Sequence, residues 1–396
     1  MKHHFKYFTL LLAASMIPTG IAYAAYPNTS MTPHQSSVEQ ARDAAQWATL
    51  RDNKIEWGEL QDLVREYNPT VSSLWLDFRE SQSRGKYNID YEDVLDQIQQ
   101  SYDASINAAN NNEILEAYAN LQYETSTTAQ GVDTSAQATD EQAAELSIRQ
   151  TEKTVTEQIR KSLISIYTTD LQRQMDQLTA DHAASLYEMQ KRKLSVGQAT
   201  QLDVLTAQET MQSAQAKLTS DQTLADKTKQ LVLVNLGWKY NDNPEICAIP
   251  MVTEEMLSTM DLTKDTQTAL SNNFAILINE RKIAVSSTDT QIGSLSTTVE
   301  NEKESVRSDM IARFNSVKSA KNSLDQAKLS LSNAQAALDK VKRSYATGAA
   351  SQRDLETAEY NTNVAKLTAD IADCSLATEY YDYLAGRDGI ATADAS

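Results

Sequence analysis

The chain offers few side chains that could do acid–base, nucleophilic or metal chemistry. Beyond its first 24 residues the only histidines are His34 and His182, and no histidine cluster could therefore bind a metal or move a proton. No nucleophile elbow, phosphate-binding loop or dinucleotide-binding glycine pattern occurs. The acidic residues are scattered along helical patterns, which is typical of solvated faces. We therefore predict that the protein is not an enzyme and needs no cofactor or metal.

The two cysteines, Cys247 and Cys374, leave two alternatives open. Their number fits an oxidising compartment, and both fall where the two halves of the chain should meet. They could form a disulfide, or they could be two free or buried thiols.

Two aspartates occupy matching positions in a string that occurs twice. The segment GQATQLDVLTAQ at 197–208 returns as GAASQRDLETAE at 348–359, and the repeated acids are Asp203 and Asp354. Each copy follows one long helical pattern and opens another. The chain is therefore predicted to be a duplicated helix–turn–helix hairpin.

The composition favours long helices and excludes nucleic-acid binding. Only 10 glycines and 6 prolines occur in 396 residues, too few for the turns of a many-stranded sheet. The formal net charge is −18, which would repel phosphate. This charge either keeps a large exposed helical surface soluble or creates an acidic lumen or mouth that favours cations.

The first 24 residues have the pattern of a secretory signal peptide. Lys2 and Lys6 precede a short apolar run, and Ala22-Tyr23-Ala24 fits the small-x-small cleavage rule. We expect secretion across the cytoplasmic membrane and a location in the cell envelope. No later segment approaches the ~18 apolar residues of a membrane-spanning helix, which does not support direct membrane insertion.

The mature chain is predicted to have two helical halves joined by a linker. The linker is distinguished by Trp238, Asn243-Pro244 and Ile249-Pro250, and a weak break is expected within the second half between Gly293 and Thr298. The predicted units are a signal peptide at 1–24, an N-terminal extension at 25–54, a first helical-hairpin repeat at 55–237, a linker at 238–253, a second repeat at 254–386 and a loose tail at 387–396.

The second half contains a sustained heptad pattern, which we call the seam. Its members follow one another at spacings of three or four, after one first step of seven. They are Met310, Val317, Ala320, Leu324, Ala327, Leu331, Ala334, Leu338, Val341 and Tyr345. The pattern predicts an all-α fold of long antiparallel coiled-coil hairpins, with alanines that allow close approach of neighbouring helices.

The repeated motif resembles the TolC-like outer-membrane efflux factor family. The resemblance covers roughly residues 55–386 and rests on a turn sequence, an acidic motif six residues later and the start of the first half. These are Val196-Gly197 and Thr347-Gly348, Asp203-Val204-Leu205 and Asp354-Leu355, and Leu60, Leu63, Val64 and Asn68-Pro69.

The resemblance implies a homotrimer whose hairpins form a hollow cylinder, located at the outer membrane. Its partners would be a periplasmic adaptor protein and an inner-membrane pump. The family cylinder normally continues into a β-barrel, but neither half offers a pair of alternating strands of about ten residues. We therefore expect a divergent member with little or no barrel.

The resemblance also assigns roles to the turn residues. Val196, Gly197, Thr347 and Gly348 would contact the adaptor, although the glycines could simply supply the positive φ of a tight turn. The two repeated aspartates would ring a narrow entrance and bind cations. They could instead be charges that stabilise helix N-termini.

Two functions follow from these alternatives. The first is a subunit of a TolC-like envelope duct for efflux or type I secretion. The second is a non-transporting extracytoplasmic coiled-coil scaffold or spacer. A duct needs closed rotational symmetry, whereas a spacer can be monomeric.

Overall fold

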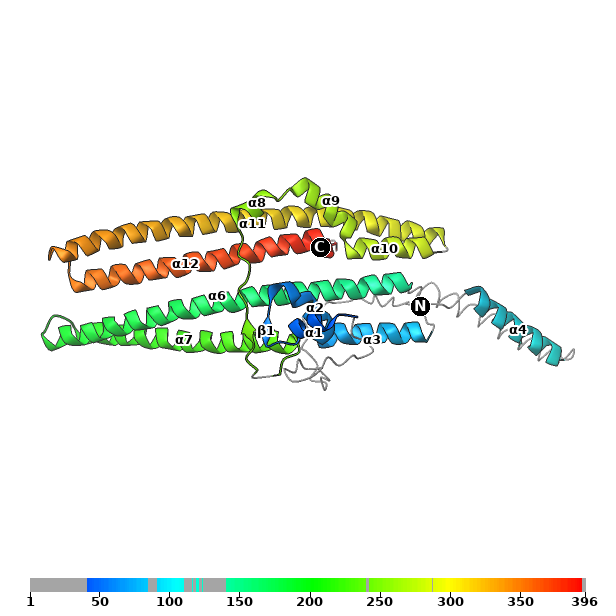
Figure 1. Ribbon diagram of the computed structural model, residues 1–396, viewed down its shortest axis with the longest axis horizontal. Coiled ribbons are helices and arrows are strands. Elements are labelled where there is room, and N and C mark those ends of the chain that lie inside the picture. Colours follow the sequence, from blue (N-terminus) through cyan, green and yellow to red (C-terminus); the bar gives the residue numbers. More distant parts are fainter. Residues whose placement is uncertain are drawn as a thin grey trace, which may run out of the picture.

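The computed structural model describes residues 41–84, 91–109, 116, 119–120, 123, 140–239, 242–286 and 288–393. The expected signal peptide and the extension up to residue 40 lie outside these ranges. Most described residues are helical, and Figure 1 shows long helices running side by side along one axis. The first-half elements are α1 (Ala44–Leu50), β1 (Lys54–Ile55), η1 (Trp57–Glu59), α2 (Leu60–Tyr67), α3 (Pro69–Ser83), α4 (Tyr91–Ala109), α6 (Glu141–Ser195) and α7 (Gln201–Asn235).

The second half has the same succession of two shorter helices and two long ones. Its elements, with the strand that precedes them, are β2 (Glu245–Ile246), α8 (Glu254–Ser258), α9 (Leu262–Asn272), α10 (Phe274–Val285), α11 (Asp289–Ala346), α12 (Gln352–Ala385) and η2 (Gly386–Ile390). The prediction of an all-α fold of long antiparallel hairpins is confirmed.

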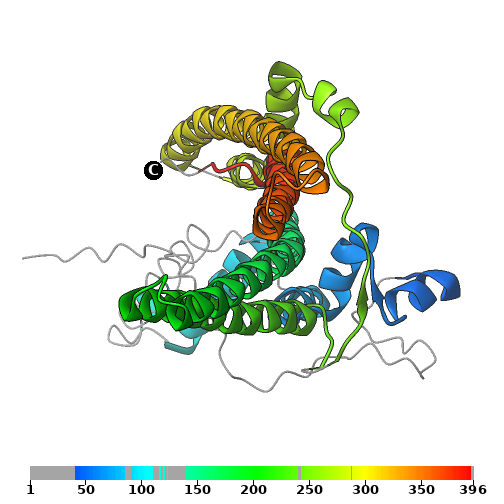
Figure 2. The same cartoon turned by 90° about the vertical axis from the view of Figure 1, so that its left-hand side faces the viewer.

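The long helices are ordered α11, α12, α6, α7 across the molecule. Each hairpin packs its two long helices together, and α12 packs against α6 to join the hairpins. Figure 2 shows these helices end-on as a curved arc with α11 and α7 at its two ends. The arrangement leaves α6 and α12 with long-helix neighbours on two sides.

Apolar side chains of the expected spacing form two main cores. The first lies where α2, α3, α6 and the end of α7 meet, and includes the fully buried Leu60, Leu63 and Val64. The second contains Met310, Val317 and Leu324 of the seam together with residues of α9, α10 and α12. The seam alanines that follow are less exposed than their helical neighbours, because they face α12.

One asparagine in each half ties a helix start to the end of a distant segment. The Oδ1 atom of Asn68 accepts hydrogen bonds from the first turn of α3, and its Nδ2 donates to the Asn235 carbonyl at 3.0 Å. The Oδ1 atom of Asn273 likewise caps α10, and its Nδ2 donates to the Ala391 carbonyl at 2.9 Å. The two halves therefore repeat a buried contact as well as an order of helices.

Two details of the predicted organisation are wrong. The chain from 387 to 393 is not a loose tail, because Ala391 and Ala393 are buried in the second core. The break expected between Gly293 and Thr298 is also absent, since α11 runs through it; a Cβ at Gly293 would meet nothing within 4 Å.

The linker crosses between the halves as an extended strap. Its β2 strand pairs in parallel with β1, with Lys54 opposite Glu245 and Ile55 opposite Ile246. Figure 1 shows the strap passing across the long helices between α7 and α8. This pairing holds the linker against the first half.

Candidate functional site

The two hairpin turns have nearly identical backbone geometry. Gly197 has φ 72° and Gly348 has φ 73°. The Gly197 N–H donates to the Leu194 carbonyl at 3.0 Å, and the Gly348 N–H donates to the Tyr345 carbonyl at 2.9 Å. Figure 1 places both turns at the same end of the molecule, which we call the tip.

The turn residues are open to solvent. A Cβ at Gly197 or Gly348 would meet nothing within 4 Å, so positive φ alone accounts for glycine at these positions. Val196 is 67% exposed, and Thr347 is also exposed. The four residues predicted to contact an adaptor are therefore accessible at one end of the molecule, and the contact itself stays a prediction.

Asp203 and Asp354 form capping boxes at the starts of α7 and α12. Oδ2 of Asp203 accepts from the Thr200 N–H at 2.7 Å and from its hydroxyl at 2.8 Å. Oδ2 of Asp354 accepts from the Ser351 N–H at 2.8 Å and from its hydroxyl at 2.7 Å. Thr200 and Ser351 in turn accept from the aspartate backbone N–H groups. Helix capping is thus observed, and the entrance ring stays a prediction.

These contacts set the direction of the aspartate pKa values. The backbone hydrogen bond from Thr200, followed by its hydroxyl, lowers the pKa of Asp203, and Ser351 lowers the pKa of Asp354 in the same way. A crowded carboxylate ring would have the opposite effect.

We predict that both aspartates titrate below the ordinary Asp value of about 3.9. Because the folded-state pKa is depressed, the capping contribution is present above the unfolded-state value and is lost as pH falls through the folded one. Thr200→Ala should raise the midpoint of Asp203 and leave that of Asp354 unchanged, as measured by carboxyl-carbon NMR. A midpoint above the ordinary value would favour the ring.

Sequence reasoning missed that the tip is basic. Residues 189–202 and 340–353 contain seven lysines and arginines and no acid, although the whole chain has a net charge of −18. All seven side chains lie on exposed residues: Lys191, Arg192, Lys193, Lys340, Lys342, Arg343 and Arg353. Counting charge in windows around the two glycines would have found this cluster.

The cysteines do not form the suggested disulfide. Both are free in the structure. Cys374 is buried in a cluster with Ile164 and Tyr167, where burial raises the pKa of its thiol. Cys247 lies on the strap, where its N–H donates to the Ile55 carbonyl at 3.0 Å. Cys247 is thus held on the strap by its bond to β1, and Cys374 is held on α12 by packing against α6.

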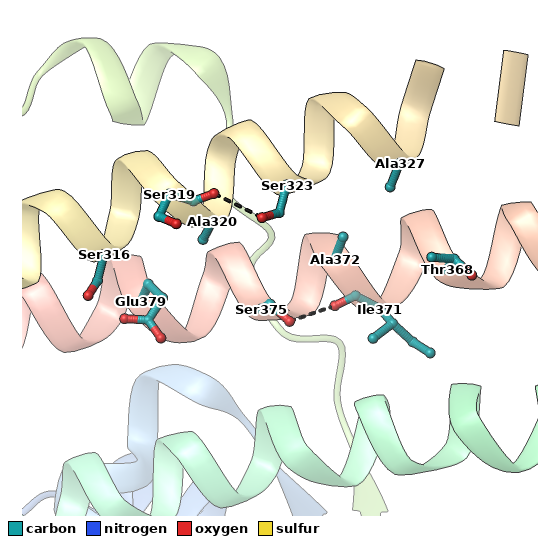
Figure 3. Close-up of a pocket in the computed structure, with 10 residues that line it drawn as sticks. All are labelled: Ser316, Ser319, Ala320, Ser323, Ala327, Thr368, Ile371, Ala372, Ser375 and Glu379. Carbon is teal, nitrogen blue, oxygen red and sulfur yellow. Dashed lines mark hydrogen bonds between the residues drawn. The ribbon is translucent and has the colours of Figure 1, made fainter. Parts of the chain in front are cut away.

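Figure 3 shows a groove of about 510 Å³ between α11 and α12 that is lined mainly by small side chains. The hydroxyls of Ser323 and Ser375 donate to carbonyls on their own helices at 3.0 and 3.1 Å. They therefore turn polar hydrogens back toward the backbone. Ala320 and Ala327 of the seam lie on its wall. The groove is part of the hairpin packing and offers no constellation for catalysis.

The remaining described residues do not add a chemical site. No three histidine, cysteine or acidic side chains within the described ranges come together as a metal site. His182 stacks on Tyr360 across the hairpins, with ring centroids 4.1 Å apart. None of the described helices is both long and apolar enough to cross a bilayer.

The edge helices of the arc carry exposed apolar side chains. On α7, Leu224 is 56% exposed and Leu231, one heptad later, is 46% exposed. On α11, Ile311 and Leu329 are 49% and 63% exposed, and their separation of five helical turns puts them on one face. Among the described helices, these stripes lie on the two long helices that have only one long-helix neighbour.

Comparison with known proteins supports the fold and no closer relationship. No family model and no curated protein matches the sequence. A membrane protein from Pseudomonas aeruginosa is similar in structure, with a TM-score of 0.51, 10% identity, and coverage of 84% of this chain and 90% of that one. CusC, whose crystal structures concern folding and transmembrane channel formation, gives a TM-score of 0.50 at 11% identity, with coverage of 93% and 99%. The resemblance inferred from the repeated motif is thereby confirmed at the level of architecture: the chain has a divergent TolC-like fold.

Proposed function

We propose that the chain is a subunit of a trimeric envelope duct for efflux or type I secretion. The observation that carries this proposal is the TolC-like arc of four long helices, whose two hairpin turns lie exposed at one end. In the proposed duct these turns dock to an adaptor protein, which connects the duct to an inner-membrane pump. The duct lies in the cell envelope, at the outer membrane.

The edges of the arc favour a closed ring over a monomeric spacer. Within the described residues, the helices at both ends of the arc leave their apolar stripes uncovered, and contact with other chains would bury them. Rotation about an axis would place α7 of one subunit beside α11 of the next, which is a heterologous contact that closes into a ring. Three such arcs would complete the cylinder that the resemblance implies.

We predict that acidic substitutions on the α7 edge break the assembly. Leu224→Asp with Leu231→Asp should convert trimers to monomers, because each leucine loses about 1.5–3 kcal/mol of burial and a charge is placed in the contact. Gln222→Asp, on another face of the same helix, is the matched control and should remain trimeric. Sedimentation velocity distinguishes these states, and a wild-type protein that is a stable monomer at micromolar concentration would rule out the duct.

Export tests the function itself. Cells producing the Leu224→Asp, Leu231→Asp chain should lose export, whereas cells producing the Gln222→Asp chain should retain it. If the chain is a spacer, loss of the ring should leave export unchanged.

A further inference from the structure

The tip carries a concentration of cations, most of which form no ion pair within the described residues. Of the seven basic side chains, Lys191 pairs with Glu188 at 3.0 Å. Within the described residues, the other six form no ion pair: Arg192, Lys193, Lys340, Lys342, Arg343 and Arg353. Basic residues elsewhere on the long helices often have acidic partners, as in Arg173–Asp170 and Lys217–Asp221.

The two repeated aspartates beside this cluster are already engaged. Asp203 and Asp354 direct a carboxylate oxygen at their own helix N-termini through the capping boxes. The pKa values of both aspartates are lowered chiefly by those hydrogen bonds, with a smaller contribution from the charges of Lys193 and Arg353, so both stay charged at neutral pH. The tip is therefore a positive surface on a strongly acidic chain.

Exposed apolar side chains accompany the cations. Val196 is 67% exposed, Leu202 is 71% exposed and Leu205 is 52% exposed. Apolar groups surrounded by charge are common at surfaces that bind another protein. Self-association of tips is disfavoured, because like charges would face each other.

The distribution of the cations distinguishes a protein partner from a membrane. Lys340 precedes Gly348 by eight residues, which places it about 12 Å along the helix from the turn. A flat lipid surface would reach the apex of the turns and leave this side chain in solvent. A helical partner that packs alongside the hairpin flanks would reach both the apex and Lys340.

We propose that the tip is a docking surface for an acidic helical partner, with glutamates and aspartates on the flanks of its end. This inference rests on the proposed function in taking the adaptor as the partner, and it specifies the charge that the adaptor must present. Exposed charge pairs contribute little each, and their main effects are on specificity, association rate and salt dependence.

The test uses the full chain and two synthetic helical hairpins. One hairpin carries glutamates over its last two turns, and the other carries glutamines at the same positions. We expect the first to bind at least about tenfold more tightly, and its binding to weaken as NaCl rises from about 50 to about 500 mM. Equal binding of the two hairpins would overturn the proposal.

Charge reversal at the tip should abolish this preference. Lys193→Glu with Lys342→Glu should weaken binding of the acidic hairpin by about tenfold or more. The matched control is Lys227→Glu with Lys366→Glu, which reverses two exposed lysines on the shafts of α7 and α12. It should bind like the wild type, and an equal loss in both variants would mean that overall charge alone acts.

Two further measurements distinguish failure of the docking proposal from failure of the proposed duct function. Binding only to phosphatidylglycerol vesicles, and not to the acidic hairpin, would identify a membrane contact and overturn the proposal. Sedimentation and export assays test the duct separately. If the chain is monomeric but still binds the acidic hairpin through Lys193 and Lys342, the duct proposal fails and the proposal of a basic docking tip stands.

Discussion

Replacing Gly389 by alanine should destabilise the second half of the molecule by about 3 kcal/mol or more. Gly389 has φ 117°, a conformation that L residues rarely adopt, and a Cβ there would lie 2.5 Å from the Asn272 carbonyl oxygen. The Asn272 oxygen is backbone, so it cannot move without shifting the start of α10 or the end of α9. Urea unfolding followed by circular dichroism would measure the loss.

Gly197→Ala is the matched control in the same chain. Its φ is also positive, but the new Cβ would lie in open space, so only about 1–2 kcal/mol of backbone strain is expected. The strain is confined to an exposed turn. Equal destabilisation by the two substitutions would show that residues 386–393 do not pack as described.

The long hairpins could be predicted from the sequence because their signal is local and periodic. The repeated string predicted a long helix before each turn, and α6 (Glu141–Ser195) and α11 (Asp289–Ala346) end there. The turn glycines could be predicted for the same reason, because the repeated motif begins at the turn glycine of each hairpin. Local pattern, helix geometry and the duplication all agree for these elements.

The parts that the sequence did not predict depend on contacts between distant segments. The two-residue strand β1 exists because it pairs with β2, nearly 200 residues later, and no periodicity can show so short an element. The ordered chain after Gly386 depends on the Asn273 contact with Ala391. For Asp203 the residue type suited a ring and a cap equally, and the cap could be seen only from the Thr200 geometry.

The tip shows a different limit of sequence reasoning. The family resemblance drew attention to two repeated acids, whereas exposed lysines and arginines outnumber the acids around the two turns. The basic residues lie in two windows some 150 residues apart, and only the antiparallel fold brings those windows to one end. The basic cluster becomes apparent only from that placement and from the helix-capping contacts of Asp203 and Asp354.

Replacing either repeated asparagine should destabilise the fold by about 3 kcal/mol. Asn68 and Asn273 are 2% and 1% exposed, and each caps a helix while its amide donates to a distant carbonyl. Alanine would remove the cap and leave the carbonyl without its donor. Because the contacts match, the two Asn→Ala losses measured by urea unfolding should be similar.

Asn68→Asp should give a pH-dependent loss that the alanine variant does not show. At neutral pH its carboxylate would still cap α3, but it would face the Asn235 carbonyl while buried, which raises its folded-state pKa. A raised carboxyl pKa means that the folded state binds the extra proton, so stability relative to wild type should recover as pH falls from 7 to about 4. The protonated carboxyl can then donate to the Asn235 carbonyl, as the amide did. If Asn68→Asp and Asn68→Ala instead changed in parallel with pH, the amide donor would have no role in joining α3 to the end of α7.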